Sequence, residues 1–575
     1  MNFAEQIRGK LQFLYPPEQA AHLFPVLMER IGAFQSRHPE FKEKKPQLSQ
    51  ADALLITYGD QVTEPGALPL QSFGEFASRH LTGVVSGVHA LPFYPSSSDD
   101  GFSVIDYYQV DPNLGSWEDI HRLGGKFRLM FDAVINHVSA QSSWFKAFLR
   151  AQPPYSDYFH TVDPAVDLSE VVRPRALPLL TRVTTSSGEK HVWTTFSSDQ
   201  IDLNYANPQV LLEILDILLF YVAQGTESIR LDAIAFLWKE IGTPCVHLPQ
   251  THQVIQLFRL VMDAVAPHVM LVTETNVPHA DNISYFGDGT NEAQMVYNFA
   301  LPPLTLHTLQ TANAAALSEW VESLSLPTRQ VTFFNFLASH DGIGLNPARG
   351  ILSEAEIAAI IAKTQSHGGL VSYKQNPDVS RSPYELNLNY FDALSSPESP
   401  EPEHIQVGRF IAAHAIMLSL VGVPGVYFHS LFGSRGWKEG PALSGHNRAI
   451  NRQKLSRRLV ESELADPASL RYKVFSRLKK LLRLRGERAA FHPFGEQQVV
   501  ELHPAVFGLL RFSPDGASRA LCLHNVSPQE TPIDFSLTKF ESKSATDMSH
   551  PQVEFRGEVA LKLRPYQVLW LDLDR

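Results

Sequence analysis

Eight short runs of apolar, β-branched and aromatic residues recur along the chain, and helical patterns separate most of them. The runs cover residues 53–59, 87–95, 127–137, 227–236, 269–275, 293–302, 330–341 and 423–433. Residues 210–225 and 254–268 are typical of the helices between them. Strands that alternate with helices favour a parallel sheet, and eight of them are what a closed barrel requires. The sequence therefore predicts an α/β fold of the (β/α)8 TIM barrel type.

The barrel pattern is interrupted twice and extended at both ends. Two stretches between apolar runs, both rich in Ser and Pro, are too long for ordinary barrel loops. An amphipathic helical stretch precedes the barrel, and short alternating runs with turn residues follow it. We expect a helical extension at 1–50, barrel segments at 51–138, 206–352 and 403–485, an inserted domain at 139–205, a lid loop at 353–402 and a C-terminal β-sandwich-like domain at 486–575.

Three acidic residues stand at or just past the ends of three apolar runs. They are Asp232 in IRLDAIAF, Glu274 in VMLVTETN and Asp341 in FFNFLASHDG. Barrel enzymes build their active sites at the C-terminal ends of the strands, so these carboxylates are expected to converge there. Cleaving a glycosidic bond with retention needs one carboxylate as nucleophile and a second as acid and then base, roughly 5 Å apart. The three carboxylates therefore predict sugar chemistry.

Polar neighbours accompany the carboxylates. Arg230 lies two residues before Asp232, so on a strand both side chains face one side and the guanidinium can keep the carboxylate ionised. His340 directly precedes Asp341, where its imidazole can donate to a sugar hydroxyl, and His137 closes the third run. Each such pair alone is more often structural. Four of these segments, all at predicted strand ends, together indicate an active site.

The four segments DAVINH, IRLDAIAF, TETN and SHDG resemble the signature segments of the α-amylase superfamily, glycoside hydrolase family 13. Longer stretches, from about residue 52 to about residue 487, resemble its sucrose phosphorylase subfamily. They are HALPFYPSSSDDGFSVIDYYQVDPNLGSW, VVRPRALPLLT, VWTTFSSDQIDLNY, NFLASHDGIGLN, SPYELNLNYFDAL and NRAINR. The chain length, SPYELN and GVYFHSLFGSRGW resemble the branch that acts on glucosylglycerate, glucosylglycerol or sucrose 6-phosphate, and 2-O-α-D-glucosylglycerate is the substrate we expect.

The resemblance implies a double displacement on an α-glucoside. Asp232 would be the nucleophile, Glu274 the acid and base, and Asp341 the stabiliser of the transition state. Formation of a β-glucosyl-aspartate releases the acceptor, and inorganic phosphate then yields α-D-glucose 1-phosphate with net retention. Phosphate is a co-substrate, and neither a cofactor nor a metal is expected.

The resemblance also assigns the pocket around these carboxylates, position by position. The residues matched to the glucose pocket are Asp99, Phe102, His137, Phe196, Arg230, His340 and Arg452. Arg175 matches the arginine that meets phosphate or the acceptor, and Tyr384 matches the residue on the opposing loop.

Two departures from the sucrose enzymes concern the acceptor. Glu385 stands where a glutamine is expected, and Asn276 stands where a histidine commonly follows the acid and base. Fructose recognition is thus weakened. Lys374 and Arg381 on the second insertion could pair with an anionic acceptor, since fixed cations recognise carboxylate and phosphate well. The alternative is that both are solvated lid residues.

Composition excludes several other functions. The formal net charge of −11 argues against a general nucleic-acid binder. The two cysteines, Cys245 and Cys522, lack the spacing of a metal site. The first residues lack the apolar core of a secretory signal, and no apolar run is long enough to span a bilayer. We expect a cytoplasmic enzyme that meets only a small sugar substrate and phosphate, with a homodimer left open.

Three alternatives stay open at this point. The same carboxylates could serve an α-glucosidase or transglucosidase, and only the residues matched to phosphate argue against it. A non-catalytic amylase-like interaction protein is expected to lack part of the carboxylate triad and to follow a membrane segment. A calcium-dependent amylase is conceivable because Asn136 can be a metal ligand in the superfamily. One asparagine is weak support for calcium, which takes six to eight oxygen ligands.

Overall fold

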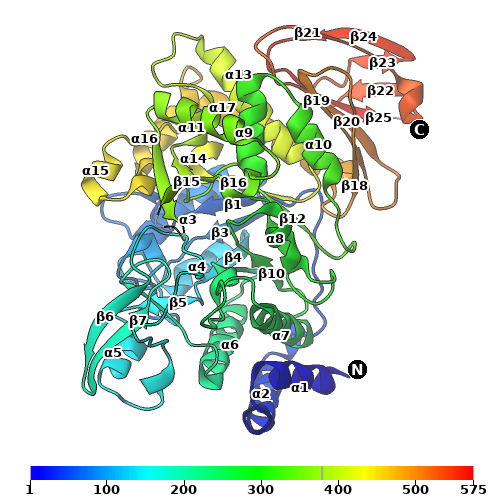
Figure 1. Cartoon of the computed structure of the whole chain (residues 1–575). Helices are drawn as coiled ribbons and strands as arrows, with labels where there is room; N and C mark the ends of the chain where they lie inside the picture. The colour runs from blue at the N-terminus through cyan, green and yellow to red at the C-terminus, as the bar shows by residue number, and fades with distance from the viewer. Residues whose placement is uncertain (1, 377, 379, 574–575) are drawn as a thin grey trace.

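Eight parallel strands close into a barrel in the computed structural model, which describes residues 2–573 apart from 377 and 379 (Figure 1). The strands are β1 (Leu54–Thr57), β3 (Gly87–Ala90), β4 (Arg128–Ala133), β9 (Ser228–Leu231), β10 (Met270–Thr273), β11 (Met295–Tyr297), β12 (Thr332–Asn335) and β16 (Val423–Tyr427). They neighbour one another in chain order, and β16 pairs with β1 to close the ring. Each lies in one of the eight apolar runs, so the predicted barrel is confirmed.

Helices connect and flank the barrel strands. They are α3 (Pro69–His80), α4 (Trp117–Gly124), α6 (Pro208–Ala223), α7 (Pro249–Val265), α8 (His279–Ile283), α9 (Leu301–Thr311), α10 (Ala315–Ser323), α13 (Glu403–Ser419), α14 (Phe428–Leu431), α15 (Gly440–Ser444), α16 (Arg457–Ala465) and α17 (Leu470–Gly486). The side chain of Asn207 caps the first turn of α6, and Pro208 occupies a position where no backbone donor is needed. No described helix is both long and apolar enough to cross a membrane.

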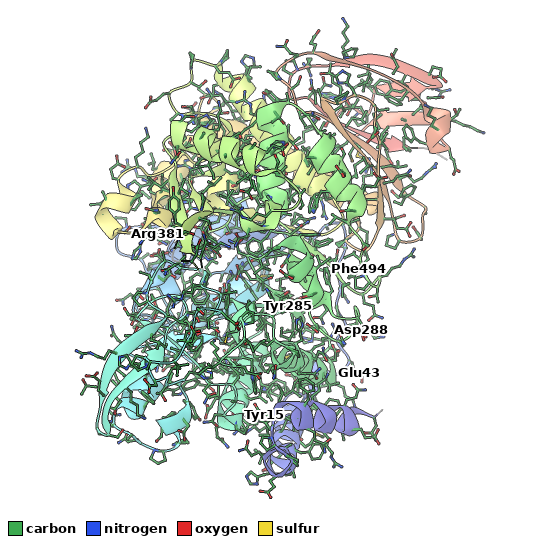
Figure 2. The ribbon with its side chains drawn as sticks, viewed as in Figure 1. Tyr15, Glu43, Tyr285, Asp288, Arg381 and Phe494 are labelled. Atoms are coloured by element: carbon green, nitrogen blue, oxygen red, sulfur yellow. The ribbon has the colours of Figure 1, made fainter. Side chains whose placement is uncertain are left out.

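Two N-terminal helices lie against the outside of the barrel. Helices α1 (Phe3–Leu14) and α2 (Pro17–Arg37) lie beside α6 and α7 (Figure 1). Tyr15, labelled in Figure 2, donates from its hydroxyl to the carbonyl of Tyr205 at 3.0 Å. Arg30 pairs with Asp216 on α6. The extension is therefore fastened to the barrel by polar contacts as well as by its apolar face.

The two insertions lie at the carboxyl ends of the strands. The first holds α5 (Ser143–Leu149), the hairpin β6 (Leu180–Thr185) and β7 (Gly188–Trp193), and β8 (Gln200–Asp202), which pairs with β5 (His137–Ser139). The second holds α11 (Glu354–Ser366), β14 (Leu370–Gln375), β15 (Arg381–Asn387) and α12 (Tyr390–Leu394). Strand β15 lies between β14 and the two-residue strand β13 (Ile343–Gly344). The second insertion is therefore tied to the segment that follows β12.

The C-terminal part is all β. Strands β18 (Glu496–Val499), β19 (Val506–Phe512), β20 (Arg519–Asn525), β25 (Val568–Leu573), β22 (Ser544–Asp547) and β23 (Glu554–Arg556) form one sheet in that order. Strands β21 (Thr531–Ser536) and β24 (Glu558–Leu563) form a second, two-stranded sheet. An apolar cluster of its own, with Leu521, Ile533 and Leu571, lies within this part. The segment limits given from the sequence remain predictions.

Candidate active site

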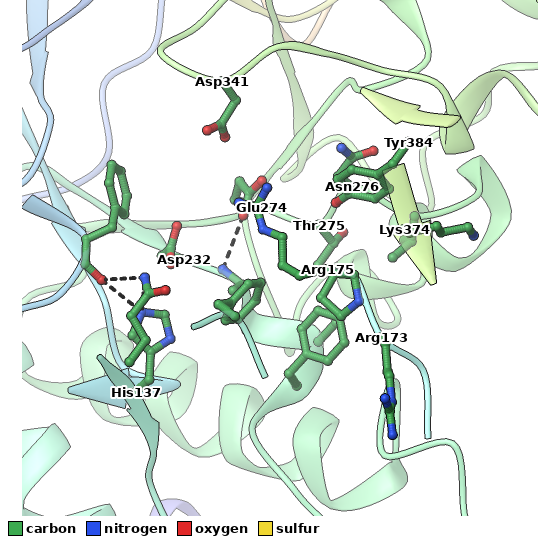
Figure 3. Close-up of a pocket in the computed structure, with 18 of the residues that line it drawn as sticks. His137, Arg173, Arg175, Asp232, Glu274, Thr275, Asn276, Asp341, Lys374 and Tyr384 are labelled. Carbon is green, nitrogen blue, oxygen red and sulfur yellow. Dashed lines mark hydrogen bonds between the residues drawn. The ribbon is translucent and has the colours of Figure 1, made fainter. Parts of the chain in front are cut away.

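A cavity at the carboxyl ends of the barrel strands is lined by all three predicted carboxylates (Figure 3). Asp232 and Glu274 directly follow β9 and β10, and Asp341 lies six residues after β12. The first insertion adds Arg173 and Arg175 to the wall, and the second insertion contributes residues from β14 and β15. The barrel thus supplies the floor of this cavity, and the insertions supply its upper wall.

Arg230 joins the first two carboxylates. Its Nη1 lies 2.8 Å from Oδ1 of Asp232, and its Nη2 lies 3.6 Å from Oε2 of Glu274. The backbone N–H of Ala233 donates to the same Oε2 at 3.1 Å. Arg230 is buried and pairs also with Asp132. Because one guanidinium reaches both carboxylates, Asp232 and Glu274 lie close together, as a double displacement requires.

Burial dominates the protonation of this pair. It raises the pKa of Asp232 to about 7, although the charge of Arg230 acts in the opposite direction. Burial also raises the pKa of Glu274 to about 7, and the negative charges of Asp232 and Asp341 add to the effect. Two neighbouring carboxyls with raised pKa values favour a state in which one holds a proton. The ion pair expected between Arg230 and Asp232 is present, but burial, which cannot be read from the spacing of the two residues, outweighs its effect on the pKa of Asp232.

Asp341 is surrounded by positively charged groups. Its Oδ1 pairs with Arg448 and lies 3.6 Å from Nη2 of Arg452 and 3.4 Å from Nε2 of His340. Burial alone would raise the pKa of Asp341, but Arg448, His340 and Arg452 outweigh it and the pKa falls below its ordinary value. Asp341 is therefore ionised throughout the neutral range, unlike the other two carboxyls.

Aromatic and polar side chains surround the carboxylates on the barrel side. The ring of His340 stacks on Phe102 with 4.6 Å between centroids, and His137 packs against Phe196. The carbonyl oxygen of Phe102 lies 2.9 Å from Nε2 of His137 and accepts from Nε2 of Gln200 at 3.0 Å. Asp99 lines the same part of the cavity. Four of the residues matched to a glucose pocket thus form one connected wall.

Arg452, also matched to the glucose pocket, lies behind this wall. Its Nη1 is 2.7 Å from Oδ2 of Asp100 and 3.6 Å from Oδ1 of Asp99. Its Nε donates to the carbonyl of His340 at 2.8 Å. Arg448, four residues earlier, lines the cavity instead. Arg448 and Gln200 were not singled out from the sequence, although both lie in segments that carry the family resemblance.

Cations lie on the insertion side of the cavity. Arg175 extends toward Glu274, whereas the ends of Arg173 and Lys374 lie farther from the carboxylates (Figure 3). None of these three side chains has an ion-pair or hydrogen-bond partner among the residues that the structure describes. Arg381 is exposed at the start of β15 and is not part of the cavity lining. Arg175 is therefore the cation best placed to meet an anionic reactant.

Amide groups accompany Arg175 on this side. Asn276 and Asn346 both line the cavity, and the Oδ1 atom of each is buried without a hydrogen-bond partner among the described residues. Tyr384 on β15 lines the same cavity and is 9% exposed. Asn346 was not predicted as a site residue, and nothing in its local sequence distinguishes it from an asparagine in a turn.

A lysine ammonium lies beside Asn136, the residue behind the calcium alternative. Nζ of Lys239 is 3.0 Å from Oδ1 of Asn136 and 2.6 Å from Oδ2 of Asp202, and it also bonds to the carbonyl of Phe236. Lys239 and Asp202 are both buried. The described residues contain no group of three or more His, Cys, Asp or Glu arranged to hold a metal ion. A fixed ammonium thus supplies the positive charge at this position.

A closed parallel barrel with two adjacent carboxylates on one arginine, and a third held ionised nearby, defines a retaining enzyme of glycoside chemistry. Residues 83–345 match the catalytic domain of α-amylase. The chain belongs to the α-amylase family and, within it, to the sucrose phosphorylase subfamily, so the predicted membership is confirmed.

Three relatives illustrate this membership. The chain is 48% identical to glucosylglycerate phosphorylase of Spirochaeta thermophila, over 99% of both chains. It is 50% identical to glucosylglycerate phosphorylase of Allomeiothermus silvanus, over 99% of this chain and 98% of the relative. A crystal structure of sucrose 6F-phosphate phosphorylase from Thermoanaerobacter thermosaccharolyticum superposes with a TM-score of 0.73 at 25% identity, covering 84% of this chain and 96% of that one.

Proposed function

We propose that the chain is a glucosylglycerate phosphorylase, which converts 2-O-α-D-glucosylglycerate and inorganic phosphate into α-D-glucose 1-phosphate and glycerate. The observation that carries the proposal is Arg175, a cation that points toward Glu274 and has no ion-pair partner in the described chain. Glycerate and phosphate are both anions, and a planar guanidinium binds carboxylate and phosphate well. The two relatives of that name, at 48% and 50% identity, support the same substrate.

The first step transfers glucose to the protein. Asp232, ionised and contacted by Arg230, attacks the anomeric carbon, while Glu274 gives its proton to the departing glycerate oxygen. Because its pKa is raised, the Glu274 carboxyl still holds that proton near neutral pH. Asp341 stays ionised and is proposed to accept from hydroxyls of the glucosyl ring, in bonds that strengthen as the transition state gains positive charge.

The second step returns glucose to phosphate. Phosphate enters where glycerate left, held by Arg175, and one of its oxygens attacks the anomeric carbon as the bond to Asp232 breaks. Glu274, now ionised, accepts a proton from phosphate when the attacking oxygen carries one. Water competes for the same intermediate, so the two insertions have to exclude it from the cavity. Retention follows from two inversions.

Other features of the proposal follow from these reactants. Phosphate and the glucoside are the only molecules that the two steps consume, so no cofactor or metal is assigned. We propose a cytoplasmic location for this reaction. A homodimer remains a prediction.

The reverse reaction tests the proposal. The enzyme is given α-D-glucose 1-phosphate with glycerate, glycerol, fructose, fructose 6-phosphate or glucose in turn, and released phosphate and new glucoside are measured. We expect glycerate to be the best acceptor by far. Glycerol or fructose 6-phosphate as the best acceptor would reassign the substrate within the subfamily. Phosphate release at the acceptor-free rate, with free glucose as the sole other product, would favour the hydrolase alternative.

A further inference from the structure

Glu385 is a fully buried carboxylate that holds an arginine of the cavity. Its Oε1 accepts from Nε of Arg448 at 2.9 Å, and its Oε2 accepts from Nη2 of the same guanidinium at 2.6 Å. The remaining terminal nitrogen, Nη1, pairs with Asp341. One guanidinium is thus shared between a carboxylate of the second insertion and a carboxylate of the barrel. Two parallel bonds to Glu385 fix its plane, as a bidentate pair does.

The backbone reinforces this contact. Glu385 lies on β15, which pairs with β13 two residues after Asp341, with Gly344 opposite Glu385 and Ile343 opposite Leu386. Gly342 leaves no room between them, since a Cβ there would lie 2.5 Å from Cγ of Glu385. The second insertion is therefore fixed to the segment of Asp341 both by backbone pairing and through Arg448.

The two carboxylates beside Arg448 limit which other groups its guanidinium can bind. Arg448 lines the cavity, yet its Nε and Nη2 are used by Glu385 and its Nη1 is used by Asp341. Both groups that contact this guanidinium are carboxylates, so its positive charge is already balanced before an anionic acceptor or phosphate binds. A neutral glutamine at position 385 accepts through a single oxygen, which would release one of these donors. The sequence predicts that Glu385 affects acceptor recognition, whereas its contacts lead through Arg448 to Asp341.

We propose that Glu385 is a positioning residue for glucosyl transfer: it holds Arg448 against Asp341, so that the second insertion controls the carboxylate beside the glucosyl ring. This inference rests on the proposed function only in giving Asp341 its contact with the sugar. It does not depend on which acceptor the enzyme uses.

The test uses a donor that needs no natural acceptor. Fluoride release from α-D-glucosyl fluoride in the presence of phosphate reports transfer of glucose to Asp232, and Glu385→Gln should lower kcat/KM for it by about tenfold to a hundredfold. Release of phosphate from α-D-glucose 1-phosphate with glycerate should fall by a similar factor. Glu401→Gln is the matched control, because Glu401 pairs with Arg409 outside the cavity. It should leave both rates unchanged.

The opposite pattern would overturn the inference. If Glu385→Gln kept the parent rate with glucosyl fluoride and lost only glycerate-dependent turnover, Glu385 would be an acceptor residue. If the parent enzyme rejected glycerate while Glu385→Gln still lowered fluoride release, the proposed substrate would be contradicted and the role of Glu385 would stand. The two failures are therefore distinguishable.

A second variant guards against simple misfolding. Arg448→Lys keeps the charge but cannot make the two parallel bonds, so it should show the same fluoride loss with an unchanged thermal midpoint. The double variant Glu385→Gln with Arg448→Lys should lose no more than the worse single variant, because both act through one contact. Additive losses would show that the two residues act separately and would overturn the proposal.

Discussion

Replacing Lys239 by methionine would leave a buried carboxylate without its counter-charge. Asp202 is fully buried and keeps only neutral donors: the backbone N–H of Thr195 at 2.8 Å, its hydroxyl at 2.6 Å and the amide of Asn136 at 3.1 Å. Methionine preserves most of the volume, so the loss is chiefly electrostatic. Breaking a buried ion pair from one side costs about 3–5 kcal/mol. We expect Lys239→Met to lower the free energy of unfolding by that amount.

The expected shift in thermal midpoint follows from the size of the chain. An unfolding entropy of about 2.1 cal/mol/K per residue gives about 1.2 kcal/mol/K over 575 residues. The midpoint should therefore fall by about 2.5–4 °C if the whole chain unfolds as one unit, and by more if a smaller unit does. Scanning calorimetry of the variant and its parent at one scan rate and protein concentration measures the difference.

A second substitution tests the cause. Asp202→Asn removes the orphaned charge, so the double variant with Lys239→Met should be more stable than Lys239→Met alone. An unchanged midpoint for Lys239→Met would refute the reasoning, because it would mean that Asp202 needs no counter-charge. A double variant less stable than the single one would refute it as well.

Three further predictions concern the reaction. Asp232→Asn removes the nucleophile and little volume, so turnover should fall to background while the calorimetric midpoint stays at or above that of the parent; retained turnover would overturn the assignment. Arg175→Ala should raise the KM for phosphate and the fraction of glucoside hydrolysed, and an unchanged ratio of phosphorolysis to hydrolysis would count against an anion role. The pH profile of kcat/KM should fall on both sides of about 7, as Asp232 gains a proton below it and Glu274 loses one above it. With α-D-glucosyl fluoride, whose leaving group needs little protonation, the acid limb set by Asp232 should remain and the alkaline limb set by Glu274 should be weak or absent.

The barrel could be predicted because its strands are buried on both faces. Such strands read as continuous apolar runs, and eight of these are visible in the printed sequence without any structural knowledge. The pairing of β13 with β15 could not be predicted in this way. It joins two short buried segments some forty residues apart, and only the packing of the second insertion against the segment after β12 selects that register.

For the candidate site, the sequence could predict where the carboxylates lie but not which arginine lines the cavity. Asp232 and Glu274 are the residues directly after β9 and β10, so the sequence alone places both at the carboxyl end of the barrel. In NRAINR the sequence offers two arginines of equal chemistry, and the 3-10 turn at Asn447–Asn451 turns Arg448 rather than Arg452 into the cavity. The pKa values depend on burial by distant segments, which no local spacing reveals.

The closure of the barrel through β1 and β16 has a consequence for biosynthesis. One edge of β1 pairs with β3 soon after it is made, but the other edge pairs with β16, at Val423–Tyr427. A ribosome that works from the N-terminus leaves that edge unpaired for most of the synthesis, and an exposed strand edge invites wrong partners. We therefore expect chaperones to bind a nascent chain stalled before residue 423, whereas one stalled beyond residue 427 already carries every strand of the barrel.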